Sequence, residues 1–121
     1  MAIVAPSLLS ADFSKLASDS AMVVNAGAEY LHIDVMDGFF VPNITLGPCV
    51  IKSLRKTSQA VFDVHLMIMN PERYINDFAA AGADIITVHT ESTDKIQECI
   101  DLIKKNGKKA ALTVKPKTDV K

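Results

Sequence analysis

The sequence predicts an α/β fold in which consecutive βα units surround a parallel sheet, as in a (β/α)8 or TIM barrel. Short apolar runs rich in β-branched residues alternate along the chain with longer segments of helical period. An internal repeat supports the barrel, because residues 26–34 (AGAEYLHID) match residues 81–89 (AGADIITVH) and two βα units make one repeat. Alternate strands of such a barrel are equivalent, and reactive groups gather at the carboxyl ends of its strands.

Five strands are expected, each a short apolar run bounded by turn-forming residues. In chain order they cover residues 3–8, 30–35, 60–65, 85–89 and 110–114. Four helices separate them and are marked by caps, prolines and a terminal glycine. The first covers about residues 12–26 with Ser10 as its cap, the second follows Gly47-Pro48, the third follows Asn70-Pro71-Glu72, and the fourth follows Ser92-Thr93-Asp94 and ends at Gly107.

A flavodoxin-like open sheet is the competing architecture. It normally has a glycine-rich phosphate loop after the first strand, and residues 6–10 (PSLLS) are not one. A closed barrel needs at least about 200 residues, whereas the expected elements already fill this chain of 121. We therefore expect residues 1–121 to form the N-terminal half of a single barrel domain, from its first to its fifth strand, with the C-terminal half absent. Open strand edges and an apolar inner face would favour a homo-oligomer.

The composition argues against several classes of partner. Thirteen Lys and Arg against fourteen Asp and Glu leave a formal net charge of -1, so no overall field points to nucleic acid or to a membrane surface. The two cysteines, Cys49 and Cys99, fit neither a metal spacing nor a disulfide framework, which suits a reducing compartment. No apolar stretch approaches the roughly 20 residues of a membrane span, and no signal-peptide pattern is visible, so we expect a cytoplasmic protein.

His32 and Asp34 are the strongest candidates for chemistry. Side chains alternate along a strand, so both point to one face near the carboxyl end of the second expected strand. Asp63 and His65 repeat the pair in reverse order on the next strand, which usually lies beside it in a parallel βαβ unit. Imidazole and carboxylate are good ligands for a divalent transition metal, so His32, Asp34 and His65 form a candidate metal site. The spacing alone also fits ordinary core histidines, with Asp34 capping a loop.

The residues after this strand, 36–43 (MDGFFVPN), form a βα loop that is rich in turn formers but carries two aromatics, so it could fold over a ligand. Asp37 and Gly38 are interpreted as a turn rather than as a second acid. Met36 and Met67 closely follow the candidate ligands and would form an apolar wall that keeps water from a reactive intermediate. Core packing is the alternative role for both methionines.

Ser7 and His89 complete the candidate set. Ser7 ends the first expected strand, where it could donate a hydrogen bond to a ligand or cap the chain locally. His89 is equivalent to Asp34 by the internal repeat. Because no second ligand pairs with it in the sequence pattern, His89 is interpreted as a structural or pocket-lining residue.

At these positions the chain resembles the ribulose-phosphate 3-epimerase family, over essentially its whole length. The resemblance rests on APSLLSAD at residues 5–12, LHIDVMDG at 31–38 followed by FVPN at 40–43, and DVHLM at 63–67. It implies a barrel of the ribulose-phosphate-binding type. It also implies an isomerase of the pentose phosphate pathway that interconverts D-ribulose 5-phosphate and D-xylulose 5-phosphate by metal-assisted proton transfer at C3.

The resemblance also implies roles for individual residues. His32, Asp34 and His65 would bind a catalytic divalent metal, usually zinc, with iron, manganese or cobalt as alternatives. Asp34 would also be an acid/base catalyst. Ser7 and His65 would contact the substrate, and Met36 and Met67 would surround the reacting carbon. The metal would stabilise the enediolate formed when the C3 proton is removed, and inversion would need a second acid/base group on the opposite face.

The chain departs from the family pattern in two places and lacks part of the expected machinery. The second catalytic aspartate, which is also the fourth metal ligand, and the phosphate-binding loops would belong to the absent half. Phe39 replaces a histidine common in the family, and residues 115–118 (KPKT) replace the usual Asn-Pro-Gly-Thr. We therefore expect the chain alone to be inactive. An epimerase for a related ketose phosphate, such as allulose 6-phosphate, and a non-catalytic half-barrel for metal binding or assembly are the alternative interpretations.

Overall fold

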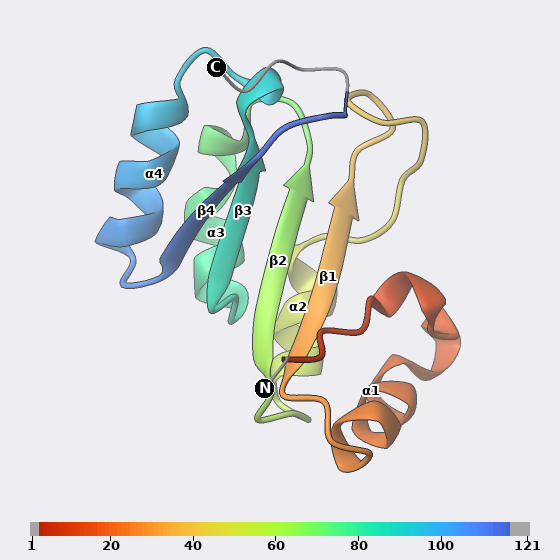
Figure 1. The fold of residues 1–121 in the computed structure, drawn as a ribbon. Coiled ribbons are helices and arrows are strands. Elements are labelled where there is room, and N and C mark those ends of the chain that lie inside the picture. The colour runs from red at the N-terminus through yellow and green to blue at the C-terminus, as the bar shows by residue number, and fades with distance from the viewer. Residues whose placement is uncertain (1–2, 117–121) are drawn as a thin grey trace.

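A parallel sheet of four strands forms the centre of the protein, in a computed structural model that describes residues 3–116 (Figure 1). The strands are β1 (Tyr30–Met36), β2 (Val61–Met67), β3 (Ile85–His89) and β4 (Lys109–Thr113). They lie in the order β1-β2-β3-β4, and every neighbouring pair is parallel. The structure thus confirms an α/β fold that fits part of a TIM barrel.

The helices alternate with these strands as the sequence predicted, but the first α-helix begins at Leu16 and not near residue 12, and Ser10 belongs to a separate 3-10 turn and does not cap it. They are α1 (Leu16–Asn25), α2 (Pro48–Arg55), α3 (Ile75–Ala81) and α4 (Ile96–Lys105). Short 3-10 turns complete the described elements: η1 (Leu8–Ser10), η2 (Phe13–Lys15), η3 (Pro71–Arg73) and η4 (Thr90–Ser92). Helices α2, α3 and α4 cover one face of the sheet, and α1 lies beside the start of β1 (Figure 1).

The two faces of the sheet have different roles because side chains alternate along each strand. The face that packs against the helices carries fully or almost fully buried apolar residues: Leu31, Ile33, Val35, Phe62, Val64, Leu66, Ile86 and Val88. Burying each of these side chains contributes roughly 1.5–3 kcal/mol to folding. The opposite face, which we call the inner face, carries His32, Asp34, Asp63 and His65. The core is therefore built on one face, and the polar candidates are left on the other.

The first expected strand is not formed. Residues 3–8 make only an isolated parallel bridge from Ser7 to His32, in which the His32 N–H donates to the carbonyl of Pro6 over 2.9 Å. Pro6 has no N–H to donate to a ladder. Ser7 then accepts a hydrogen bond from the Leu9 N–H at 3.2 Å and caps η1, which turns the chain away. The sheet therefore contains the second to fifth expected strands, and the prediction of a strand at 3–8 was wrong.

Each copy of the repeated Ala-Gly-Ala segment connects the end of a helix to the next strand. Gly27 and Gly82 follow α1 and α3 and have φ values of 116° and 121°, a region that favours glycine. At Gly82, an added Cβ would also meet the side chain of Arg55. Each repeat therefore ends a helix tightly and leads the chain into the following strand.

Arg55 connects the segments at the amino ends of β2 and β3. Its guanidinium donates to the carbonyls of Ser58, Ala60 and Gly82 and to the carboxylate of Asp84. It also lies 3.8 Å from the centroid of the Phe62 ring. Arg55 thus joins the end of α2 to the starts of β2 and β3, at the opposite end of the strands from the candidate site.

Candidate metal centre

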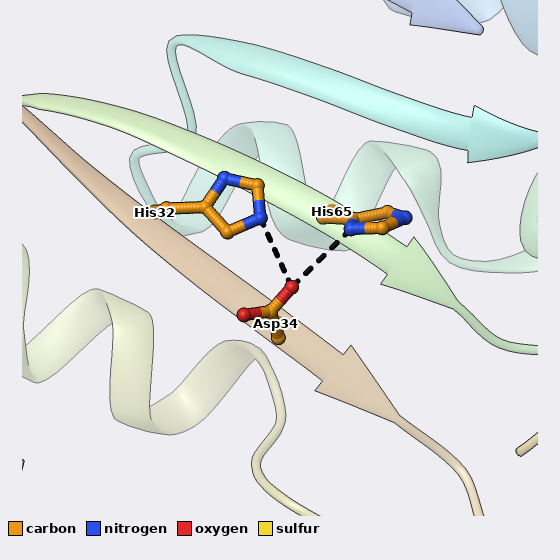
Figure 2. Close-up of side chains that lie close together, drawn as sticks. All are labelled: His32, Asp34 and His65. Carbon is orange, nitrogen blue, oxygen red and sulfur yellow. Dashed lines mark hydrogen bonds and ion pairs between the residues drawn. The ribbon is translucent and has the colours of Figure 1, made fainter. Parts of the chain in front are cut away.

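Three side chains converge on the inner face at the carboxyl half of β1 and β2 (Figure 2). The register pairs Asp34 with His65, so the two residues lie side by side, and His32 precedes Asp34 by two positions on the same face. Asp34 Oδ1 is 3.0 Å from His32 Nε2 and 3.2 Å from His65 Nδ1. One potential ligand atom from each residue lies within 4.8 Å of the others, so the group could hold a metal ion.

Asp34 is anchored on both sides of its carboxylate. Its Oδ1 faces the two histidines, while its Oδ2 accepts a 2.7 Å hydrogen bond from the Ser7 hydroxyl. Its backbone carbonyl accepts a 2.8 Å hydrogen bond from the Thr45 hydroxyl. These contacts leave the side chain of Asp34 with one orientation and place Ser7 directly beside the candidate site.

The charges of the site favour a cation next to Asp34. Burial alone would raise the pKa of Asp34, but hydrogen bonds from His32, His65 and Ser7 outweigh it and hold this pKa well below its usual range. Hydrogen bonds to Asp34 and then Asp63 raise the pKa of His32 to about 10, against the opposing effect of burial. In the metal-free protein, protonated His32 therefore supplies the positive charge.

The chemistry of this donor set fits a divalent transition metal. Two imidazoles and one carboxylate are the ligand types of catalytic zinc sites, in which three protein ligands leave a position open for water or substrate. The ring nitrogen of each histidine that faces away from Asp34 already has a partner. Asp63 Oδ2 lies 3.0 Å from His32 Nδ1, and His89 Nε2 lies 2.8 Å from His65 Nε2. Such outer contacts orient metal-binding histidines.

Met36 and Met67 lie where the sequence analysis placed them relative to the ligands. They are paired in the register, one step further along the inner face than Asp34 and His65, and both are half-buried. A cavity of about 520 Å³ lies nearby, between the loops after β1 and β2, and Met36 and Tyr74 are among its lining residues. None of the three candidate ligands lines it. The candidate metal centre therefore lies on the inner face and not in this cavity.

Asp37 forms a turn, as predicted. Its carboxylate accepts the backbone N–H groups of Phe39, Phe40 and Met69 at 2.8 to 2.9 Å. Gly38 has a φ of 75°, and Asp37 forms an antiparallel bridge with Ile44. The carboxylate of Asp37 is thus fully engaged in holding the loops after β1 and β2 together.

The two aromatic residues of this loop point in different directions. Phe39 is 81% exposed, whereas the ring of Phe40 lies 5.1 Å from the ring of His89. Lys115 Nζ lies 3.9 Å from the centroid of the Phe40 ring, a cation–π contact. The loop therefore folds over the inner face through Phe40. Lys117, one of the residues that depart from the family pattern, lies outside the described residues.

The sequence analysis missed the outer partners of the two histidines. Alternation along β2 already placed Asp63 on the same face as His65, and only the register shows that it lies next to His32. His89 was expected to have no paired ligand, but its ring stacks on His65 at 4.8 Å and contacts it through Nε2. Glu91, whose Oε1 is 3.4 Å from His89 Nδ1, was not identified at all.

Comparisons with known proteins identify the family of this chain. A family model described as the ribulose-phosphate 3 epimerase family matches residues 3–121. Curated ribulose-phosphate 3-epimerases from Synechocystis sp., Bacillus subtilis and Escherichia coli are 49%, 50% and 50% identical over 96%, 97% and 96% of this chain. The aligned regions cover 51%, 54% and 52% of those proteins, so the chain spans about half their length.

Solved structures support the fold alone. A Yersinia pestis DHPS structure superposes with a TM-score of 0.64 and 14% identity, over 97% of this chain and 45% of its own. A dihydropteroate synthetase structure gives a TM-score of 0.65 and 13% identity, over 98% of this chain and 48% of its own. No helix within residues 3–116 is long and apolar enough to cross a membrane. The family match over nearly the whole sequence, together with the identities near one half, shows that the chain belongs to the ribulose-phosphate 3-epimerase family.

Proposed function

We propose that this chain provides one half of the active site of an enzyme that interconverts D-ribulose 5-phosphate and D-xylulose 5-phosphate. The observation that carries the proposal is the convergence of His32, Asp34 and His65 on one point of the inner face. Residues 1–121 would be the N-terminal half of a single (β/α)8 barrel domain. The substrate would bind over the inner face at the carboxyl ends of the strands, where active sites of such barrels lie.

Asp34 is the acid/base group for the proton at C3 in this proposal. Its lowered pKa keeps it ionised at neutral pH, and the carboxylate is the form that accepts a proton. Ser7 holds the second oxygen of the same carboxylate and so fixes its direction. Ser7 is also close enough to this point to contact a bound substrate, as is His65.

His32, Asp34 and His65 would hold a divalent metal, most often zinc, with iron, manganese or cobalt as alternatives. When bound, the metal would supply positive charge that stabilises the negative charge developing on the substrate oxygens. Met36 and Met67, on the next step of the inner face, would shield the reacting carbon from water. Together these residues form one side of a proton-transfer site.

Inversion at C3 also needs a proton from the opposite side of the substrate. Among the described residues, Asp37 is the carboxylate that follows Asp34 most closely, and three backbone N–H groups already occupy it. The family resemblance places this second group in the other half of the barrel, so we expect it to come from outside residues 3–116. The 121-residue chain alone should then exchange the C3 proton weakly and should not epimerise.

This proposal can be tested with the zinc-loaded chain and D-ribulose 5-phosphate in D2O. Proton NMR should show slow loss of the C3 signal without accumulation of D-xylulose 5-phosphate. Asp34→Asn should abolish the exchange, while Asp94→Asn, at an exposed position before α4, should leave it unchanged. Robust epimerisation by a verified 121-residue product would overturn the half-site assignment. Faster exchange with allulose 6-phosphate would favour a hexulose phosphate, and no exchange would favour a non-catalytic half-barrel.

The family acts on sugar phosphates, and other expectations from the sequence remain predictions. A cytoplasmic location and a homo-oligomeric state are two of them. Light scattering on the purified chain tests the second, because a defined dimer or larger species is expected and a monodisperse monomer would contradict it.

A further inference from the structure

We propose that His89 and Glu91 are positioning residues that keep a proton on Nε2 of His65 and so direct its Nδ1 at the metal site. This inference rests on the metal site in the proposed function. It assigns a role to one residue of β3 and one of η4, neither of which is a candidate metal ligand. Its basis is a continuous line of polar contacts that starts at Asp34 and ends on the backbone after β4.

The first step is the contact between two imidazoles. His65 Nδ1 lies 3.2 Å from Asp34 Oδ1, and its other nitrogen, Nε2, lies 2.8 Å from His89 Nε2. The two rings are stacked, with centroids 4.8 Å apart and planes inclined by 18°. Two ring nitrogens at this distance must share a single proton, because one has to donate and the other has to accept. The location of that proton sets the tautomer of His65.

The contact between His89 and Glu91 determines which of the two Nε2 atoms donates. His89 Nδ1 lies 3.4 Å from Glu91 Oε1, a charge contact that does not have hydrogen-bond geometry, and the negative charge of the carboxylate favours a proton on this nearer ring nitrogen. A proton on His89 Nδ1 leaves Nε2 of the neutral ring as an acceptor. His65 must then donate from Nε2, and Nδ1, which faces Asp34, is the nitrogen that a metal can take when it displaces the proton there. The metal ligand of His65 in this arrangement is Nδ1.

Hydrogen bonds from the surrounding chain hold His89 and Glu91 in place. His89 is 7% exposed, and its carbonyl accepts a 2.8 Å hydrogen bond from the Ser92 hydroxyl, which holds η4 against the end of β3. Glu91 Oε2 accepts a 2.7 Å hydrogen bond from the Lys115 N–H, just past β4. The position of the Glu91 carboxylate is therefore set by two separate parts of the backbone.

The two metal-site histidines are thus supported differently. His32 meets a carboxylate directly, whereas His65 meets a second imidazole that in turn meets a carboxylate. Outer partners of this type fix the tautomer and direction of a metal-binding histidine, and their loss typically costs 10–100-fold in metal affinity. The arrangement makes β3 and η4 part of the metal site without supplying a ligand.

Zn2+ affinity of the full 121-residue chain provides one test. His89→Leu, which removes the acceptor, should weaken Zn2+ binding about tenfold or more. His89→Gln, whose side-chain oxygen can accept the His65 Nε2–H, should restore affinity to within about threefold of the original chain, on the same reasoning. Thr87→Val serves as the control, because Thr87 pairs with His65 in the register but lies outside the line of contacts. It should bind Zn2+ as the original chain does.

The tautomer can be read directly from histidine 15N shifts of the metal-free and Zn2+-loaded chains. His65 Nε2 should carry the proton, and a coupling across the Nε2···Nε2 hydrogen bond should disappear in His89→Leu. A proton on His89 Nε2 in the Zn2+-loaded chain would overturn the proposal, as would unchanged Zn2+ affinity in His89→Leu. If the original chain binds no Zn2+, the metal site itself fails and the positioning role fails with it. Normal Zn2+ binding that is insensitive to His89 refutes the positioning role alone.

Discussion

Asp63 Oδ2 lies 3.0 Å from Nδ1 of His32, the ring nitrogen that faces away from Asp34. His32 therefore stands between two carboxylates, one on each ring nitrogen. With both nitrogens facing acceptors, the ring carries two protons when no metal is present. Metal binding at Nε2 would remove one of them, while Asp63 would keep the proton on Nδ1.

Replacing Asp63 by asparagine should weaken metal binding. The amide lacks the negative charge that orients and polarises the His32 ring, so Zn2+ affinity should fall by about tenfold. Isothermal titration calorimetry of the purified chain measures this. Asp94→Asn, which changes an exposed acid by the same chemistry, should leave the affinity unchanged. Equal losses in both variants would show that net charge, and not the contact with His32, controls binding.

Metal affinity should rise with pH across the neutral range. The pKa of His32 is raised to about 10 in the metal-free chain, so a bound metal must displace its proton at every pH below that value. The apparent affinity for Zn2+ should therefore increase about tenfold per pH unit between pH 6.5 and 8, as expected for one displaced proton. A titration series in buffers of equal ionic strength measures the slope, and a flat profile would contradict the protonated state of His32.

The stability of the metal-free chain should decline toward both ends of the pH scale. Because the pKa of His32 is raised, its contribution is fully present below pH 6.5 and is lost as the pH rises through about 10. The pKa of Asp34 is lowered, so its contribution is present above 3.8 and is lost as the pH falls toward its folded-state value. Urea unfolding at pH 3, 7 and 10 should give its highest midpoint at pH 7. A midpoint that keeps rising up to pH 10 would exclude the proposed role of His32.

His65→Ala should abolish the stabilisation that metal confers. A metal that binds only the folded chain raises its stability, by about 2.7 kcal/mol when its free concentration is 100 times Kd. Addition of Zn2+ should therefore raise the melting temperature of the original chain but not that of His65→Ala. Thr87→Val, at the neighbouring position on β3, should respond to Zn2+ like the original chain. A full response in His65→Ala would remove this residue from the metal site.

Arg55→Met should destabilise the fold without affecting the metal site. The substitution leaves carbonyls at Ser58, Ala60 and Gly82 without their charged donor, and the expected loss is about 3 kcal/mol in the free energy of unfolding. Arg73→Met is the matched control, because Arg73 is exposed and should cost under about 0.5 kcal/mol. Chemical denaturation measures both values. Similar small losses would show that the contacts of Arg55 contribute little.

The sequence predicted most of the sheet because periodicity is a local property. Alternation along β1 and β2 was enough to put His32, Asp34 and His65 on one face. The segment 3–8 failed because its apolar pattern resembles a strand, whereas the lack of an N–H on Pro6 and the cap formed by Ser7 limit it to one bridge. Whether residues 3–8 form a strand depends on the neighbouring strand with which they could pair, and a local sequence pattern does not show that neighbour.

The outer partners of the site depended on relations between strands. Which residue of β2 lies next to His32 is a matter of register, and a shift by one residue would turn Asp63 to the other face. His89 belongs to a different strand from His65, and its contact follows from how β2 and β3 lie together. The family resemblance indicated the ligands, but the supporting contacts became visible only in three dimensions.

The carboxylate of Asp37 couples the loop after β1 to the loop after β2. It accepts N–H groups from the loop after β1 and from Met69 after β2, so one side chain clamps two connections that the sequence separates by a whole βα unit. A displacement of one segment would therefore be transmitted to the other through Asp37, and substitution of Asp37 would remove this link.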